Sequence, residues 1–488
     1  MTAFIAPPTD TAETYGWDTV FATHIADANA AIVKAGSSPS SFAASDVADG
    51  YSVSGGFGPW QIVTGGSGDL IRLSIPFQNA VVRGPGNVSQ TCAGAALVDV
   101  RLAYLDHDEA PPSGTSKVLK VQAQSSGPDY PAASVVSVSY AGTAPGFLFQ
   151  AALEGMLGSW LNENLQDFDH VFATVNLDRT ADQGAFQWMQ PTYVGYAYAD
   201  MGTPGDGLLS VLCMTQGRAD TGLAQQVSGL VIPSGQRAGF LVSKERLLAN
   251  LLLPCMPQVF QGTVASDFVL SASGDAIVNA SGSIGFQVTT PASNGHAAAT
   301  YHAQIVNLQL TVEAQELQMS VTTVTEVSPG IQAYCQTQNF LGIRLVNKQD
   351  GTQTLGFFDS RPAVKTHWTQ ASPGIEITEE ILGIVALLLA AVAVVVSGGA
   401  AIGAVALIVG LVAGVMTLTT TIIESVGNND APSIDALVLD STASITWPDS
   451  KDFQLGNACL NDSLQLGGTL SAAVSQRASM AVVTQAAV

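Results

Sequence analysis

The chain has 488 residues, a formal net charge of −22 and only 11% charged residues. Its 17 Lys and Arg residues are scattered, so the chain lacks the clustered positive charge that neutralises phosphate backbones, and nucleic-acid binding is not expected. A chain of this length can bury a large core, either as several domains or as one or two elongated ones.

The N-terminal segment "MTAFIAPPTDTAE" contains neither the basic nor the apolar region of a secretory signal. We therefore expect synthesis in the cytoplasm, with any release following a non-classical route. Residues 1–14 are expected to form a disordered tail, and residues 471–488 a second tail at the other end. The segment "IADANAAIVKAG" predicts a short helix after an N-terminal strand.

Alternating apolar residues predict half-buried antiparallel strands along much of the chain. In "DLIRLSIPF" the apolar residues are Ile71, Leu73, Ile75 and Phe77, and in "VDVRLAYLD" they are Val98, Val100, Leu102 and Tyr104. The longest such signal is "HAQIVNLQLTVEAQELQMSVTTVTEV", in which one face is predicted to carry Val306, Leu308, Leu310 and Val312. Long strands with one apolar face are therefore expected to dominate the architecture.

Two further segments have the spacing of amphipathic helices. In "ALEGMLGSWLNENLQDF" one helical face carries Leu153, Met156, Leu157, Trp160, Leu161, Leu165 and Phe168. In "SKERLLANLLL" Ser243 is placed as an N-cap before a buried set of leucines. Together these patterns predict an α+β protein in which long curved antiparallel sheets wrap around a few apolar helices.

The stretch of 43 residues from Ile381 to Ile423 contains no charge. Ser397, Gly398 and Gly399 divide it into two arms of about 16 and 17 residues, which as helices span roughly 24 to 26 Å, less than the roughly 30 Å of a bilayer core. Its flanks are acidic, with Glu379, Glu380 and Glu424, and lack basic anchors. A buried helical hairpin is the leading interpretation, while an acid-triggered membrane-inserting hairpin and a permanent anchor stay open.

Signals for catalysis and for cofactors are weak. The chain has no GxSxG, HExxH, Walker or strand-linked GxGxxG motif, and its five cysteines form no CxxC pair. We expect no catalytic residue, no metal site and no cofactor. Aromatic residues near position 190 and the apolar hairpin are the candidates for lining a lipid pocket, namely Trp188, Tyr193, Leu387, Val394, Ile402, Leu407 and Leu411.

Several blocks, in order, resemble the clostridial neurotoxin-associated forty-seven-kilodalton protein family, which is related to the OrfX proteins. These blocks are "TYGWDTVFATHIADANAAI", "NLQDFDHVFATVNLD", "ADQGAFQWMQPTYVGYAY", "SVLCMT" and "AGFLVSKERLLANLLLP". The resemblance covers roughly residues 15 to 460 and is carried by the joint order of the blocks, since none of them is a catalytic signature. It implies a fold similar to the tubular lipid-binding (TULIP) superfamily.

The expected organisation is one elongated unit over residues 15–470, with the apolar hairpin at 381–423. Whether this unit forms two lobes, about 15–250 and 251–470, stays open at this point. The leading functional hypothesis is a non-enzymatic protein that shields a lipid or another apolar ligand in an internal tunnel. The alternatives are an accessory or scaffold subunit of a secreted toxin-like complex, with a protein partner encoded nearby, and an acid-triggered membrane-inserting effector whose contact with the membrane is transient.

Overall fold

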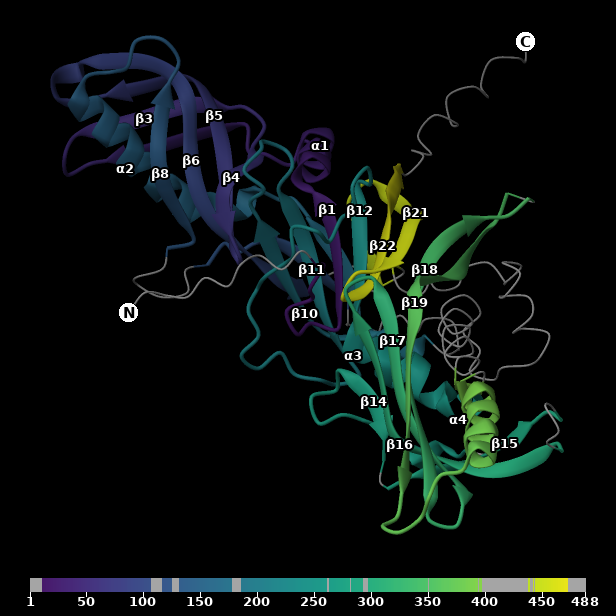
Figure 1. The fold of residues 1–488 in the computed structure, drawn as a ribbon. Helices are drawn as coiled ribbons and strands as arrows, with labels where there is room; N and C mark the ends of the chain where they lie inside the picture. The colour runs from purple at the N-terminus through teal and green to yellow at the C-terminus, as the bar shows by residue number, and fades with distance from the viewer. Residues whose placement is uncertain are drawn as a thin grey trace, which may run out of the picture.

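The computed structural model is elongated, with a sheet at each end and a third sheet between them (Figure 1). It describes residues 11–106, 116–124, 131–177, 186–260, 263–280, 282–292, 297–349, 351–393, 395–396, 438, 442 and 444–472. Every strand pairing within these residues is antiparallel. The described strands form sheets of six, nine and seven strands.

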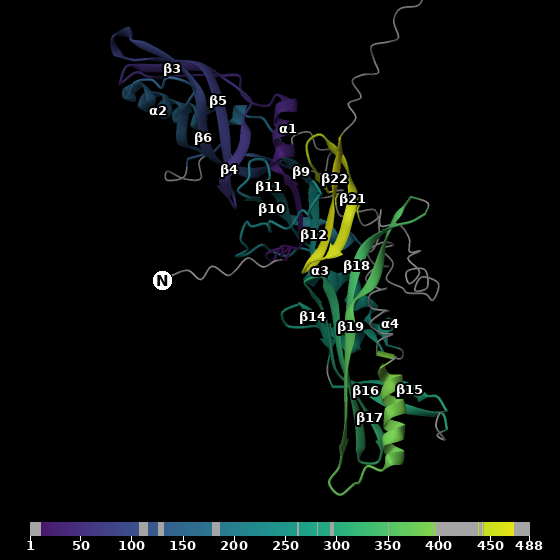
Figure 2. The ribbon, with the colours of Figure 1, turned by 45° about the horizontal axis from the view of Figure 1, so that its top comes forward.

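The six-stranded sheet lies in the middle of the molecule and brings together the two ends of the described chain (Figure 2). Its strands, in spatial order, are β10 (Pro191–Ala199), β11 (Leu208–Thr215), β1 (Thr19–His24), β12 (Ala238–Ser243), β22 (Ser463–Ala472) and β21 (Ser450–Leu460). The helix α1 (Ile25–Ala35) follows β1 directly, as the sequence predicts. Because β12 pairs with β22, the sheet pairings join segments on either side of residue 250. The division into two lobes stays a prediction.

The nine-stranded sheet forms one end of the molecule, with the helix α2 (Phe147–Asn164) beside it (Figure 1). The strands of this sheet are β2 (Ser41–Asp46), β3 (Tyr51–Phe57), β4 (Gln61–Ser67), β5 (Leu70–Arg83), β6 (Ser89–Asp106), β7 (Ser116–Val121), β8 (Ala133–Tyr140), β9 (Ala173–Asn176) and β20 (Ile445–Thr446). The strand β2 lies at an edge of the sheet.

The seven-stranded sheet forms the other end of the molecule. Its strands follow β12 of the central sheet in the chain, and several of them are long. Its strands are β13 (Phe268–Leu270), β14 (Ala276–Asn279), β15 (Ile284–Thr290), β16 (Ala299–Glu313), β17 (Glu316–Ser328), β18 (Ile331–Asn347) and β19 (Gln353–Ala371). The short helices α3 (Lys244–Leu247) and α4 (Met256–Val259) lie between the central sheet and this one in the chain.

The alternation predicted for β5 is confirmed, because Ile71, Leu73, Ile75 and Phe77 are all buried. The prediction for β16 is wrong at Val306, whose side chain is 38% exposed. A register shift lies between Ile305 and Asn307, where β16 pairs with β17. An extra residue at such a bulge moves its side chain out of the alternation, so the buried row continues from Ile305 to Leu308 instead.

Both predicted amphipathic segments form helices, which differ from the prediction in where they begin or in their helix type. α2 begins five residues before the predicted segment and buries Leu153, Met156, Leu157, Trp160 and Leu161. Ser243 caps α3, since its hydroxyl accepts a hydrogen bond from the Arg246 backbone N–H at 3.3 Å. The helix then widens into a π-helical turn, Leu248–Leu252.

The uncharged stretch is described only in its first arm, where residues 381–393 belong to a helix that begins at Glu379, and Leu388 is fully buried. The rest of the predicted hairpin, and most of both predicted tails, lies outside the described residues. Within the described part of the chain, none of the helices combines the length and apolar character that a membrane span requires. The wrapping of sheets around long apolar helices therefore stays a prediction.

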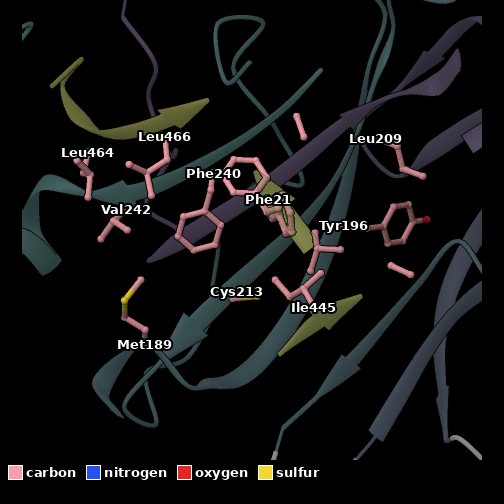
Figure 3. Close-up of a cluster of buried hydrophobic side chains, with 14 of the residues drawn as sticks. Phe21, Met189, Tyr196, Leu209, Cys213, Phe240, Val242, Ile445, Leu464 and Leu466 are labelled. Atoms are coloured by element: carbon pink, nitrogen blue, oxygen red, sulfur yellow. The ribbon is translucent and has the colours of Figure 1, made fainter. Parts of the chain in front are cut away.

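One face of the central sheet carries a cluster of buried side chains, including Phe21, Phe240, Val242, Leu464 and Leu466 (Figure 3). The rings of Phe21 and Phe240 meet edge to face, with centroids 5.7 Å apart. This cluster is continuous with the core of the other two sheets. The three sheets are therefore joined by contacts between their buried side chains and not only by the backbone.

Tyr196 adds a polar link between the central and nine-stranded sheets. Its buried hydroxyl donates to the Asp69 carbonyl oxygen at 2.6 Å and accepts from the Leu102 backbone N–H at 2.8 Å. Burial is the largest cause that raises the pKa of this phenol, so it stays protonated and able to donate.

Candidate functional site

A mostly apolar cleft of about 270 Å³ lies between α1 and the β21–β22 hairpin, and we call it the α1 cleft. Figures 1 and 2 show α1 beside the β21–β22 hairpin. Its lining residues come from β1 and α1, from Phe172 and Arg237 in the middle of the chain, and from segments more than 400 residues after β1 and α1. They are Thr23, Asp27, Ala28, Ala30, Ala31, Lys34, Phe172, Arg237, Trp447, Pro448, Asp449, Ser450 and Leu470.

The floor of the α1 cleft is an extension of the central core. Thr23 lies two residues after Phe21 on β1, so the two side chains are on the same face of the sheet. The ring of Trp447 meets that of Phe21 edge to face at 5.7 Å. The floor is thus held by packed aromatic residues and is preformed.

Two buried polar atoms of this floor have no hydrogen-bond partner in the described part of the chain. They are Oγ1 of Thr23 and Nε1 of Trp447, on side chains that are 2% and 3% exposed. A buried polar group left unpaired costs about 1 to 3 kcal/mol. The floor therefore carries a buried hydroxyl and a buried N–H that no group in the described part of the chain satisfies.

The rim of the α1 cleft consists of two ion pairs that join α1 to distant segments. Arg237 Nε donates to Asp27 Oδ2 at 3.3 Å, and Lys34 Nζ lies 2.8 Å from Asp449 Oδ1. The side chains of Arg237 and Lys34 are 58% and 57% exposed. Exposed pairs of this kind are worth about 0.2 to 1 kcal/mol each, so they can exchange partners readily.

His170 does not line the α1 cleft itself but contacts Phe172, which does. Its ring meets that of Phe172 edge to face at 4.8 Å, and its Nδ1 lies 3.0 Å from Ser37 Oγ. Burial lowers the pKa of this imidazole to about 4, against the opposing effect of Asp449 and Asp169. The ring is therefore neutral at physiological pH.

The arrangement is suited to binding an amphipathic ligand. The cleft combines an apolar floor with paired charges at its mouth, the combination expected for an amphipathic ligand. Across the described residues, no three His, Cys, Asp or Glu side chains come together in a way that could hold a metal ion.

A second hollow, of about 970 Å³, lies between α2 and the edge strand β2, and we call it the α2 groove. One wall is a face of α2 with small side chains, including Ala151, Gly155 and Ser159, and the rim carries Asp46, Asp49 and Glu163. A Cβ atom built on Gly155 would meet nothing within 4 Å. Packing against the described part of the chain therefore does not require a glycine at that position.

Three of the sequence-predicted lining residues are described, and none of these three lines the α1 cleft. Trp188 packs against the main core cluster, Tyr193 is 41% exposed and stacks on Trp17 at 6.2 Å, and Leu387 is half-buried on the helix at 379–393. The remaining candidates lie outside the described residues, namely Val394, Ile402, Leu407 and Leu411. Their role in ligand binding stays a prediction.

Sequence reasoning missed the α1 cleft because its parts are remote in the chain. The pair Arg237–Asp27 spans 210 residues and the pair Lys34–Asp449 spans 415. The only local signal is the spacing of Asp27 and Lys34 on α1, which places them two helical turns apart. Oppositely charged residues at such spacing are common on solvated helix faces, so this signal carries little information.

Comparison with known proteins agrees with the fold and with the order of the sequence blocks. The family model OrfX-like, described as Protein OrfX2/OrfX3/P47, matches residues 14–468. Protein OrfX3 of Paraclostridium bifermentans is 30% identical over 492 residues, covering 94% of this chain and 98% of the relative. Protein OrfX3 of Clostridium botulinum (strain Kyoto / Type A2) is also 30% identical, with the same coverage.

A solved structure supports the same assignment at the level of the fold. The structure of P47 from Clostridium botulinum A2 has a TM-score of 0.60 and 18% sequence identity, and the match covers 94% of this chain and 98% of that chain. The family model and the relatives confirm the resemblance carried by the residue blocks. The chain therefore belongs to the OrfX-like family of OrfX2, OrfX3 and P47 proteins.

Proposed function

We propose that this protein is a non-enzymatic accessory protein that binds the apolar part of a lipid-like amphiphile in the α1 cleft. The observation that carries the proposal is the cleft itself, with its preformed apolar floor, its two unpaired polar atoms and its charged mouth. The resemblance to the OrfX and P47 proteins implies a TULIP-like fold, and lipid binding is associated with that fold. The names of the relatives, Protein OrfX3 and Protein P47, specify no reaction.

The energetics favour a short length of a single chain. An apolar cavity of roughly 150 Å³ holds a benzene molecule, so about 270 Å³ accommodates one ring or a segment of one acyl chain. Each methylene group removed from water contributes about 0.8 kcal/mol. The remainder of a longer chain would extend beyond the cleft, where the predicted tunnel of the TULIP-like unit would have to cover it.

The test is native mass spectrometry of protein purified without detergent, with organic extraction to identify any bound molecule. A matched pair of variants on α1 localises the site: Ala30→Leu adds a side chain within the cleft, whereas Ala26→Leu adds it to an exposed position that does not line the cleft. We expect bound fatty acid or phospholipid in the parent and in Ala26→Leu, and much less in Ala30→Leu. A ligand-free mass that persists after incubation with phospholipid and fatty acid would refute the proposal.

A second candidate function is that of a scaffold subunit in a toxin-like complex, and the α2 groove favours it. Gly155 costs about 1 kcal/mol relative to alanine inside a helix, yet none of its neighbours among the described residues requires a glycine there. A glycine permits another backbone to approach closely. Phe147 and Leu148, at the start of the same helix, are 81% and 64% exposed.

For the scaffold function we expect a protein partner encoded nearby. Co-purification of the products of neighbouring genes with the parent, with Gly155→Leu and with Gly285→Leu would test it. A Cβ on Gly285 also meets nothing within 4 Å, and this residue lies on β15, in the sheet at the other end of the molecule. Equal recovery of the partner with all three proteins would exclude the α2 groove as its docking site.

A further inference from the structure

The rim of the α1 cleft carries equal numbers of positive and negative side chains, and this restricts the charge of the ligand head group that it can bind. It carries two cations, Arg237 and Lys34, and two carboxylates, Asp27 and Asp449, in two mutual pairs. The surrounding chain has a net charge of −22. A ligand with a net negative charge would therefore approach an unfavourable potential and find both cations already paired.

The two ion pairs lie at opposite ends of one face of α1. Asp27 and Lys34 are seven residues apart, which corresponds to about 10 Å along the helix. The apolar residues Ala28 and Ala31 lie between them on the same wall, and Phe172 and Leu470 complete the floor. A chain resting on this floor would therefore bring its head group against one of the two pairs.

The two pairs differ in the chemistry that they offer. Arg237 presents a planar guanidinium, whose fork of N–H donors matches the oxygens of a phosphate group. Lys34 presents a single ammonium, which acts as a point charge. An exposed phosphate-bearing head group is thus better matched by the Arg237 end than by the Lys34 end.

Displacing Asp27 from Arg237 has a consequence for the head group. An anionic phosphate on Arg237 leaves the Asp27 carboxylate without its partner, at a position where the side chain is only 35% exposed. A head group that also carries an ammonium can place it on Asp27, so that one ion pair is replaced by two. A zwitterion therefore leaves both Arg237 and Asp27 with an oppositely charged partner, whereas an anion leaves Asp27 without one.

From this balance we propose that the α1 cleft binds a zwitterionic phosphate–ammonium head group, with the phosphate on Arg237, the ammonium on Asp27 and the attached chain on the apolar floor. The inference rests on the proposed function for the chain and adds the class of head group. The same chemistry occurs in a lipid such as lysophosphatidylcholine and in the free head group glycerophosphocholine. The experiment must distinguish these two sources.

The experiment measures the Kd of the full-length protein by titration calorimetry for three probes below their micelle concentrations. Lysophosphatidylcholine and lysophosphatidic acid share one acyl chain and differ in the charge of the head group, and glycerophosphocholine lacks the chain. We expect lysophosphatidylcholine to bind up to about fivefold more tightly than lysophosphatidic acid, since one additional exposed ion pair of about 1 kcal/mol corresponds to a factor of about five. Glycerophosphocholine alone should bind more weakly than either lysolipid.

Two matched variants assign the head group to one end of the cleft. Arg237→Gln should abolish the preference for lysophosphatidylcholine, whereas Lys34→Gln, which removes an equally exposed cation at the other end, should retain it. Both side chains are exposed, and thermal unfolding of each variant in the absence of ligand checks that it folds. Loss of the preference in Lys34→Gln alone would overturn the assignment to Arg237.

The remaining outcomes separate this inference from the proposed function. Equal affinity for the two lysolipids would overturn the head-group class while leaving chain binding intact. No binding of either lysolipid would overturn both. Binding of glycerophosphocholine as tight as that of lysophosphatidylcholine would support the head-group class and refute a role for the chain.

Discussion

His170 is expected to make the native state sensitive to acid. Its pKa is lowered to about 4 in the folded protein, chiefly because the ring is buried, whereas an unfolded histidine titrates near its ordinary value of 6.5. The unfolded chain therefore binds a proton before the folded chain does as the pH falls. The stability held by the neutral imidazole is complete above pH 6.5 and is lost progressively between pH 6.5 and about 4.

The size of the effect follows from the shift. A difference of about 2.5 pKa units corresponds to roughly 3 kcal/mol at 1.36 kcal/mol per unit. The opposing carboxylates Asp449 and Asp169 are themselves paired with Lys34 and Lys120, which limits how far they can favour a protonated ring. Since Nε2 has no partner within the described residues, a proton placed there would be buried without a hydrogen bond.

The assay compares the free energy of unfolding in urea for the parent and for His170→Phe at pH 7.5, 6, 5 and 4.5. Phenylalanine fits the aromatic surroundings of Phe168 and Phe172 and cannot titrate, although it loses the contact with Ser37, at a cost of about 1 kcal/mol. The parent should be the more stable protein at pH 7.5 and should lose this advantage as the pH falls. His302→Phe, at an exposed position on β16, is the matched control. A difference between parent and His170→Phe that stays constant across this range would refute the reasoning.

Four further changes test separate parts of the structure. Asp18→Asn should destabilise the protein by about 3 to 5 kcal/mol in urea unfolding, because the fully buried carboxylate pairs with Arg218. Gly155→Ala should stabilise the protein by about 1 kcal/mol in the same assay, since the added methyl group meets no neighbour. Thr23→Val should leave the protein as stable or more stable in urea unfolding, because it removes an unpaired buried hydroxyl. Leu388→Arg should abolish soluble expression, measured as the fraction in the cleared lysate, since this side chain is fully buried.

Local sequence patterns predicted much of the secondary structure because strands and helices of this protein are amphipathic. The alternation in β5 and the helical spacing in α2 each report which side of an element contacts the core. The cap at Ser243 was predictable for the same reason, since an N-cap depends on residues only three positions apart. The bulge at Val306 was not, because it depends on how β16 aligns with β17.

The candidate site was not predictable from the sequence. Its floor is formed where β1 meets Trp447, and its rim is formed by pairs that span 210 and 415 residues. The aromatic residues singled out near position 190 have high local density, yet Trp188 and Tyr193 pack in different clusters. Local composition does not report which face of the folded sheet a residue occupies.

The sequence by itself determined the antiparallel strands, the family and the placement of several helices, because each depends on residues that are close in the chain or on blocks that occur in a set order. The tertiary structure decided which strands became neighbours. In particular, β22 pairs with β12, and β12 is itself the neighbour of the N-terminal strand β1. That pairing brings Leu470 and the segment before β21 beside α1. The α1 cleft forms because the three sheets share one continuous core, which brings these remote segments into contact. No local sequence pattern specifies those contacts.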